Sequence, residues 1–123
     1  MDIFTAARNG DSEFISRFVA GGGNVEQVDR NGMTPLHMAA DNRRSGAVAI
    51  LVKAGARLDR KDRWGQTPLM LAAGRNDAAT IKLLLAAGVD LKAKAANGLT
   101  ARGYAADNGY HEIAAVLKKA GAP

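Results

Sequence analysis

Apolar residues recur along the chain in short blocks, which polar and glycine-rich turns separate. The blocks 48–52 and 81–85 place Val, Ile and Leu at the i, i+3 and i+4 positions of one helix face. Each is preceded by a block that contains an alanine pair, at 39–40 and at 72–73. Short side chains at these pairs let neighbouring helices approach closely. The pattern therefore predicts pairs of short helices that pack against one another.

The same pattern returns with a fixed period. The segment 31–40, NGMTPLHMAA, recurs as WGQTPLMLAA at 64–73 and in degraded form as NGLTARGYAA at 97–106. The threonines at 34, 67 and 100 are 33 residues apart, and a second series keeps the same step: Gly22, Gly55, Gly88 and Gly121. An alanine pair at 6–7 extends the register by one unit towards the start of the chain. The chain therefore holds four units in one register, which is typical of a repeat architecture.

Start and stop signals frame each helix pair. Thr34 and Thr67 are predicted N-caps, and each is followed by a proline at the first helical position, where its missing N–H costs nothing. The first helix is predicted to end near 41–42 or 74–75, and the glycine series fits the left-handed position after the second helix. Asp-Arg-Asn-Gly and Asp-Arg-Trp-Gly before the threonines favour tight turns. One such unit cannot bury its apolar face alone, so the units must stack.

These units resemble ankyrin repeats, whose Thr-Pro-Leu-His signature stands intact at 34–37. The resemblance covers residues 2–122 and implies an all-α solenoid of stacked helix-turn-helix units with projecting β-hairpin-like loops. It implies one domain, 1–123, divided into an N-terminal capping repeat (1–28), two repeats (29–61 and 62–94) and a C-terminal capping repeat (95–123). Both end units carry polar residues, such as Arg17 and Lys118, where the interior units carry apolar ones. We therefore expect a complete array and a monomer.

Composition narrows the function classes. Hydrophobic residues make up 47% of the 123 residues, which is typical of one globular domain. The absence of cysteine excludes disulfides, thiolate metal sites and cysteine nucleophiles. No apolar run reaches the ~18 residues of a membrane span, and the first residues do not resemble a signal peptide. We expect a soluble, cytoplasmic protein without membrane contact.

Candidate catalytic chemistry is sparse. The two histidines, His37 and His111, lie far apart in the repeat scheme, and no third metal-ligand type recurs beside either. The resemblance implies that His37 braces the loop near a helix start. The glycines at 21–23 lack the lysine and the strand-to-helix context of a phosphate-binding loop. The sequence predicts no enzyme, no metal site and no cofactor.

The resemblance implies a binding surface made of the loop tips and the ends of the first helices, which line a concave groove. Reading these positions by period gives the candidate protein-binding residues Arg30, Asn31, Met33, Asp41, Asn42, Lys61, Arg63, Trp64, Gln66 and Arg75. Trp64 is the only tryptophan, and its repeat partners are ordinary turn residues, Asn31 and Asn97. We predict that Trp64 anchors a partner protein and that Arg30, Arg63 and Arg75 receive its acidic groups. The alternative is that Trp64 merely covers Arg63 or a neighbouring loop.

Two other functions remain open at this stage. The net charge of +5 is compatible with nucleic acid, to which the arginines would offer phosphate contacts and Trp64 a stacking surface. That charge is modest, and carboxylates stand near the same tips: Asp29, Asp41, Asp59 and Asp62. The other possibility is a stable scaffold without a physiological partner.

One turn breaks the pattern of the others. The helix-to-helix turn of the second unit carries Arg43 where the outer units carry Gly10 and Gly109. Arginine tolerates a left-handed conformation poorly. We expect the turn at 41–46 to be the most irregular and mobile, either rebuilt through Gly46 or strained at Arg43.

Overall fold

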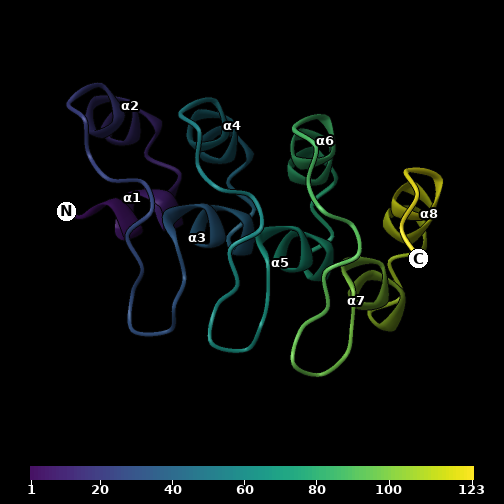
Figure 1. Cartoon of the computed structure of the whole chain (residues 1–123). Coiled ribbons are helices and arrows are strands. Elements are labelled where there is room, and N and C mark those ends of the chain that lie inside the picture. Colours follow the sequence, from purple (N-terminus) through teal and green to yellow (C-terminus); the bar gives the residue numbers. More distant parts are fainter.

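The computed structural model describes residues 1–123 and contains eight helices and no strand. The helices form four consecutive pairs: α1 (Ile3–Asn9) with α2 (Ser12–Ala20), α3 (Pro35–Asp41) with α4 (Ser45–Lys53), α5 (Pro68–Gly74) with α6 (Ala78–Ala86), and α7 (Ala101–Asp107) with α8 (His111–Lys119). The pairs stand side by side in chain order, and long loops project from the row between successive pairs (Figure 1). The all-α solenoid predicted from the sequence is confirmed.

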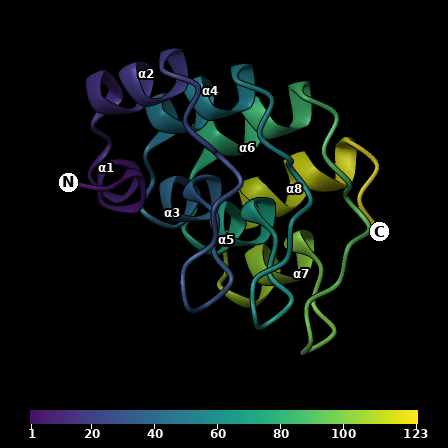
Figure 2. The same cartoon turned by 60° about the vertical axis from the view of Figure 1, so that its left-hand side comes forward.

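The first and second helices of the pairs form two layers. Seen from the side, α2, α4, α6 and α8 follow one another in one layer, and α1, α3, α5 and α7 in the other (Figure 2). The alanine pairs 6–7, 39–40 and 72–73 are fully buried where consecutive first helices meet. Their short side chains allow the close approach predicted above. Larger buried residues, among them Leu51 and Leu84, fill the space between the layers.

The predicted helix boundaries are confirmed. Thr34, Thr67 and Thr100 each accept a hydrogen bond at the side-chain hydroxyl from the backbone N–H three residues on, at 3.2–3.4 Å. The glycines after the second helices all have positive φ: 79° at Gly22, 88° at Gly55, 85° at Gly88 and 107° at Gly121. These caps place the first helices, and with them the projecting loops, at regular intervals.

The turn at Arg43 is not rebuilt. Arg43 has φ 60°, the same left-handed conformation as Asn76 (57°), Gly10 (72°) and Gly109 (75°), and Gly46 lies inside α4. The rebuilt form of the prediction is therefore wrong, because all four turns share one geometry. The strained form stands, since a side chain in this conformation costs about 1–2 kcal/mol.

The outermost helices carry exposed polar residues. Arg17 on α2 and Lys118 on α8 are exposed.

None of the eight helices combines the length and the apolar character that a membrane-spanning helix needs.

Candidate protein-binding surface

Three loops project from the stack, and their turns are built around polar side chains. In the first, Asp29 and Met33 pair across the neck at 3.0 Å, and Asp29 Oδ1 accepts the backbone N–H groups of Asn31 and Met33 at 2.8 and 3.0 Å. In the second loop Asp62 Oδ1 accepts those of Trp64 and Gln66 at 2.9 and 2.8 Å. These carboxylates therefore lie within the turns and hold them in shape.

The loops are also joined to one another. The Arg63 N–H donates to the Asn31 carbonyl at 2.9 Å, and the Ala96 N–H donates to the Trp64 carbonyl at 3.0 Å. Glycine is required at the second junction, because a Cβ on Gly65 (φ 76°) would lie 2.9 Å from the Ala96 nitrogen. The three loops thus form one continuous surface, residues 28–33, 61–66 and 94–99, which we call the loop edge.

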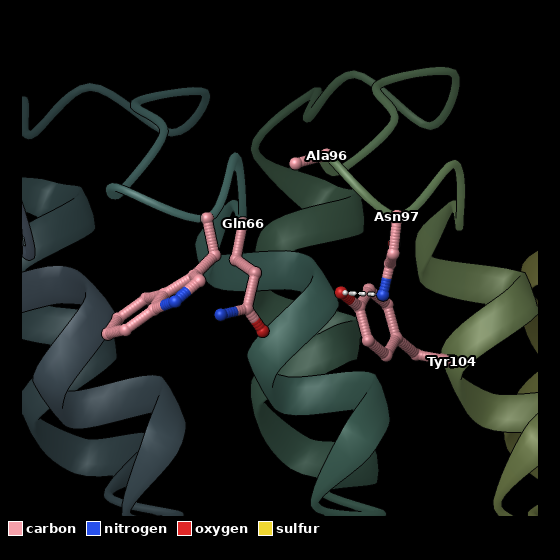
Figure 3. Close-up of a pocket in the computed structure, with 5 residues that line it drawn as sticks. Gln66, Ala96, Asn97 and Tyr104 are labelled. Carbon is pink, nitrogen blue, oxygen red and sulfur yellow. Dashed lines mark hydrogen bonds between the residues drawn. The ribbon is translucent and has the colours of Figure 1, made fainter.

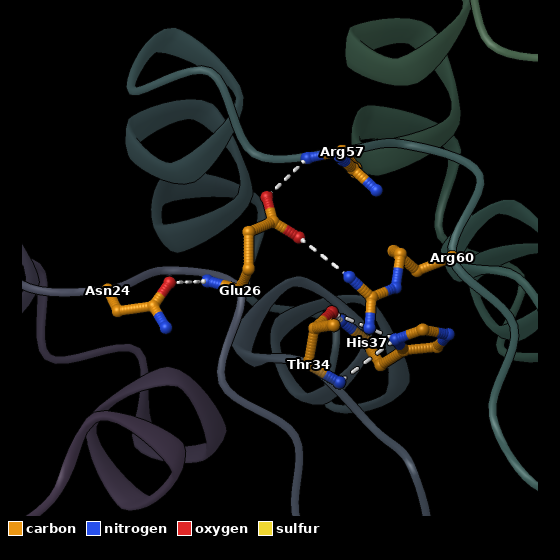
Figure 4. A network of polar contacts seen from close by, with 6 residues as sticks. All are labelled: Asn24, Glu26, Thr34, His37, Arg57 and Arg60. Atoms are coloured by element: carbon orange, nitrogen blue, oxygen red, sulfur yellow. Dashed lines mark hydrogen bonds and ion pairs between the residues drawn. The ribbon is translucent and has the colours of Figure 1, made fainter.

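A buried histidine fixes the second loop to the helix layer. His37 Nδ1 accepts the Thr34 N–H at 3.1 Å, and Nε2 donates to the Gln66 carbonyl at 2.9 Å. Burial lowers the pKa of His37, which favours the neutral ring that these two contacts require. The polar network above it pairs Glu26 with Arg60 and with the Arg57 N–H (Figure 4). The bracing role expected of His37 is confirmed, and it reaches the next repeat.

The cations of the loop edge are more exposed to solvent than its carboxylates. Its cations are all exposed: Arg30, Lys61, Arg63 and Lys94. Its carboxylates accept backbone N–H groups within the turns, and Asp62 is buried. The carboxylates Asp29 and Asp62 therefore lie near the same tips, as expected from the sequence, but both accept backbone N–H groups, and Asp62 is withdrawn from solvent. The loop edge presents a cationic face to solvent.

Trp64 lies on this face and is 48% exposed. The guanidinium of Arg63 lies 5.2 Å from the centre of its indole ring, within the range of a cation–π contact. The alternative interpretation of the sequence, that Trp64 covers Arg63, thus describes one contact of the ring, and about half of the Trp64 surface is left to solvent.

A hollow of about 490 Å³ lies beside Trp64, between the second and third loops (Figure 3). It is lined by Trp64, Gln66, Ala96, Asn97 and Tyr104. Asn97 Nδ2 donates to the Tyr104 hydroxyl at 3.1 Å, which joins the third loop to α7. A second hollow of about 180 Å³ shares Gln66 and Tyr104 and continues past Arg75 at the end of α5. We call the two hollows together the groove.

The remaining candidate residues occupy different surroundings. Arg75 Nε and Asp41 Oδ1 form an ion pair at 3.0 Å within the groove. Asn42 Nδ2 donates to the Met38 carbonyl at 2.8 Å and so caps its own helix. Asn31 is half-buried and accepts the weak 3.5 Å contact of Arg63 Nη1.

The prediction that Met33 belongs to the exposed surface is wrong. Met33 is only 8% exposed and belongs to the core. The reason is its pairing with Asp29 across the neck of the loop, which places Met33 against the helices instead of at the tip.

Sequence reasoning misses Tyr104. Its repeat partners are Met38 and Leu71, so the position reads as an apolar helix residue. The one signal that could have found it is an aromatic hydroxyl at a position that is apolar in both interior units. No group of three or more His, Asp or Glu residues is placed to hold a metal ion.

Comparison with known families agrees with this architecture. A family model described as ankyrin repeats in three copies matches residues 3–62, and one described as ankyrin repeats in many copies matches residues 51–105. The chain therefore belongs to the ankyrin repeat family, whose members are generally protein–protein interaction modules and typically non-catalytic. No curated protein matches the chain.

Proposed function

We propose that the chain binds a partner protein through the loop edge and the groove, with Trp64 as the apolar anchor. The observation that carries the proposal is the half-exposed indole of Trp64 beside a hollow, on a face whose exposed charges are cationic. Tryptophan and arginine are enriched among residues that dominate binding free energy. Arg30, Arg63 and Arg75 are the proposed contacts for acidic groups of the partner, and a cytoplasmic monomer is the form we propose.

Rigidity of the surface supports this function. Backbone hydrogen bonds join the second loop to both of its neighbours, and His37 ties that loop to the helix layer. A surface held in its binding conformation loses less entropy on association than a mobile one. The repeats thus supply a preformed platform on which Trp64 has a fixed position.

Nucleic acid is the second candidate, favoured by one specific observation. The four cations of the loop edge are exposed while its carboxylates are engaged in the turns. Phosphates would bind the cations, and a base would stack on Trp64. Such binding falls steeply with salt, whereas an apolar anchor in a hollow is much less sensitive.

Affinity capture from a nuclease-treated lysate of the source cells tests the proposal. The native chain is compared with a Trp64→Ala, Arg63→Glu variant and with a matched control, Arg57→Glu, Val116→Ala, whose two residues are also exposed but lie outside the loop edge. We expect one protein to be retained by the native chain and the control and lost by the first variant. Equal retention by all three would contradict the proposed surface. Retention that nuclease alone abolishes would favour nucleic acid, and no retention would favour a scaffold without a partner.

A further inference from the structure

Two side chains with an unused hydrogen-bond donor or acceptor line the hollow beside Trp64, which we call the upper hollow of the groove. Gln66 Nε2 donates to Asp62 Oδ2 at 3.3 Å, but Gln66 Oε1 accepts no hydrogen bond within the chain. The Tyr104 hydroxyl accepts from Asn97 and donates to nothing. The upper hollow, which Trp64 also lines, thus offers one acceptor and one donor.

An acceptor and a donor at one site match the backbone of an extended chain. Each residue of an extended segment carries a free N–H and a free C=O, whereas those of a helix interior are paired within the helix. The hollow of about 490 Å³ also has room for one large side chain. These features favour an extended segment that inserts a single apolar residue into the hollow that Trp64 and Tyr104 help to line.

The end of the groove around Arg75, which we call its lower end, carries charged side chains. Asp41 holds the Nε atom of Arg75, and the two terminal nitrogens of that guanidinium have no hydrogen-bond partner. Arg43 Nη1 donates to the backbone carbonyl of Arg75 at 3.3 Å, which adds a second arginine next to this end of the groove. The free terminal nitrogens of Arg75 form the fork that binds a carboxylate with two parallel hydrogen bonds.

The distance between the upper hollow, at Gln66, and the lower end, at Arg75, is set by helix α5. The helix itself, Pro68–Gly74, advances about 9 Å at the helical rise of about 1.5 Å per residue. The extended backbone at Thr67, between Gln66 and the helix, adds about 3–6 Å, which gives about 12–15 Å from Gln66 to Arg75. An extended chain advances about 3.3 Å per residue and covers this length in about four residues.

We propose that the groove receives an extended segment of the partner protein that carries a large apolar residue and, about four residues away, an aspartate or glutamate. The apolar side chain occupies the hollow lined by Trp64 and Tyr104, the backbone contacts Gln66 Oε1 and the Tyr104 hydroxyl, and the carboxylate binds Arg75. This inference rests on the proposed function and specifies the partner's chemistry at that same site.

Selection of a random peptide library of about twelve residues on the intact chain tests the inference. We expect the enriched peptides to share an aromatic or large aliphatic residue with Asp or Glu three to five positions away, in line with the four-residue estimate. With Arg75→Glu we expect Lys or Arg at the same offset. With the control Arg57→Glu, an exposed arginine outside the groove, we expect the acidic pattern to persist.

A double-mutant cycle between the chain and a selected peptide keeps the inference testable if charge reversal at Arg75 disturbs the fold. One enriched peptide without tryptophan is titrated while the emission of Trp64, the only tryptophan, is followed. Arg75→Gln and the Asp→Asn or Glu→Gln change in the peptide are each expected to weaken binding by about tenfold, and together by little more than either alone.

Three results would overturn the inference. They are enrichment without an acidic residue at a fixed offset, an unchanged pattern with Arg75→Glu, and independent, additive losses in the cycle. Selection with Trp64→Ala distinguishes failure of the segment chemistry from failure of the proposed binding surface. If the selected peptides need Trp64 but no acidic residue, the segment chemistry is wrong and the proposed surface stands, whereas peptides retained without Trp64 contradict both.

Discussion

Replacement of Gly65 by alanine tests whether the joined loops stabilise the fold. Gly65 has φ 76°, and a Cβ there would lie 2.9 Å from the Ala96 nitrogen, which donates to the Trp64 carbonyl. The Ala96 nitrogen belongs to the backbone and not to the end of a flexible side chain, so the two loops must separate. The substitution therefore combines an unfavourable backbone conformation with the loss of a contact between repeats.

Two other loop glycines supply matched controls. Gly98 has φ 84°, and a Cβ there would have no atom within 4 Å, so Gly98→Ala measures the conformational cost alone. Gly32 has φ 75°, and a Cβ there would lie 3.3 Å from the Arg63 nitrogen, so it is intermediate. We expect Gly98→Ala to lower the free energy of unfolding by about 1 kcal/mol. Gly65→Ala adds the crowding and the lost hydrogen bond, for a total of about 2–3 kcal/mol.

Urea unfolding followed by circular dichroism at the helix band measures all three variants. The order Gly98→Ala, Gly32→Ala, Gly65→Ala is expected for increasing loss of stability, with the slope against urea unchanged. Equal losses at Gly98 and Gly65 would refute the reasoning, because they would show that contact between the loops contributes nothing.

Three further outcomes follow from the structure. Because burial lowers the pKa of His37, the unfolded chain binds its proton more readily than the native chain, and native stability falls as pH drops below about 6.5. Urea unfolding at about pH 7.5 and about pH 5.5 should show a larger loss for the native chain than for His37→Met. Arg43→Gly relieves a left-handed side chain at φ 60° and is expected to raise the free energy of unfolding by up to about 1 kcal/mol, more than Asn76→Gly does in the same urea assay. Met33→Ala is expected to cost about 2 kcal/mol in the thermal or urea unfolding of the chain while leaving its affinity for the partner unchanged, since Met33 is buried.

The fold could be predicted from the sequence because its signals are local and repeated. Thr34 and Pro35 start a helix by hydrogen bonding and geometry within one turn, and the same pair recurs at Thr67 and Pro68. The glycine series ends the second helices for an equally local reason. Both the helix starts and the helix ends recur with the same period, so each unit is the same helix pair. Such units bury their apolar faces by stacking on one another.

The candidate site could be predicted only in part. The exposure of Trp64 followed from its place at a turn that the core does not need. The pairing of Arg75 with Asp41 joins residues of different repeats, and the period does not say which side chains meet there. Asp62 reads as a surface charge in the sequence, yet its carboxylate accepts the N–H groups of its own turn.

The central claim is that Trp64 anchors the partner on the loop edge. Titration calorimetry with the captured partner measures this directly for the native chain, for Trp64→Ala and for Val116→Ala, an exposed apolar control on α8. We predict a loss of about 2 kcal/mol, roughly a 30-fold weaker Kd, for Trp64→Ala and no change for Val116→Ala. A Kd that stays within about twofold for Trp64→Ala would contradict the claim.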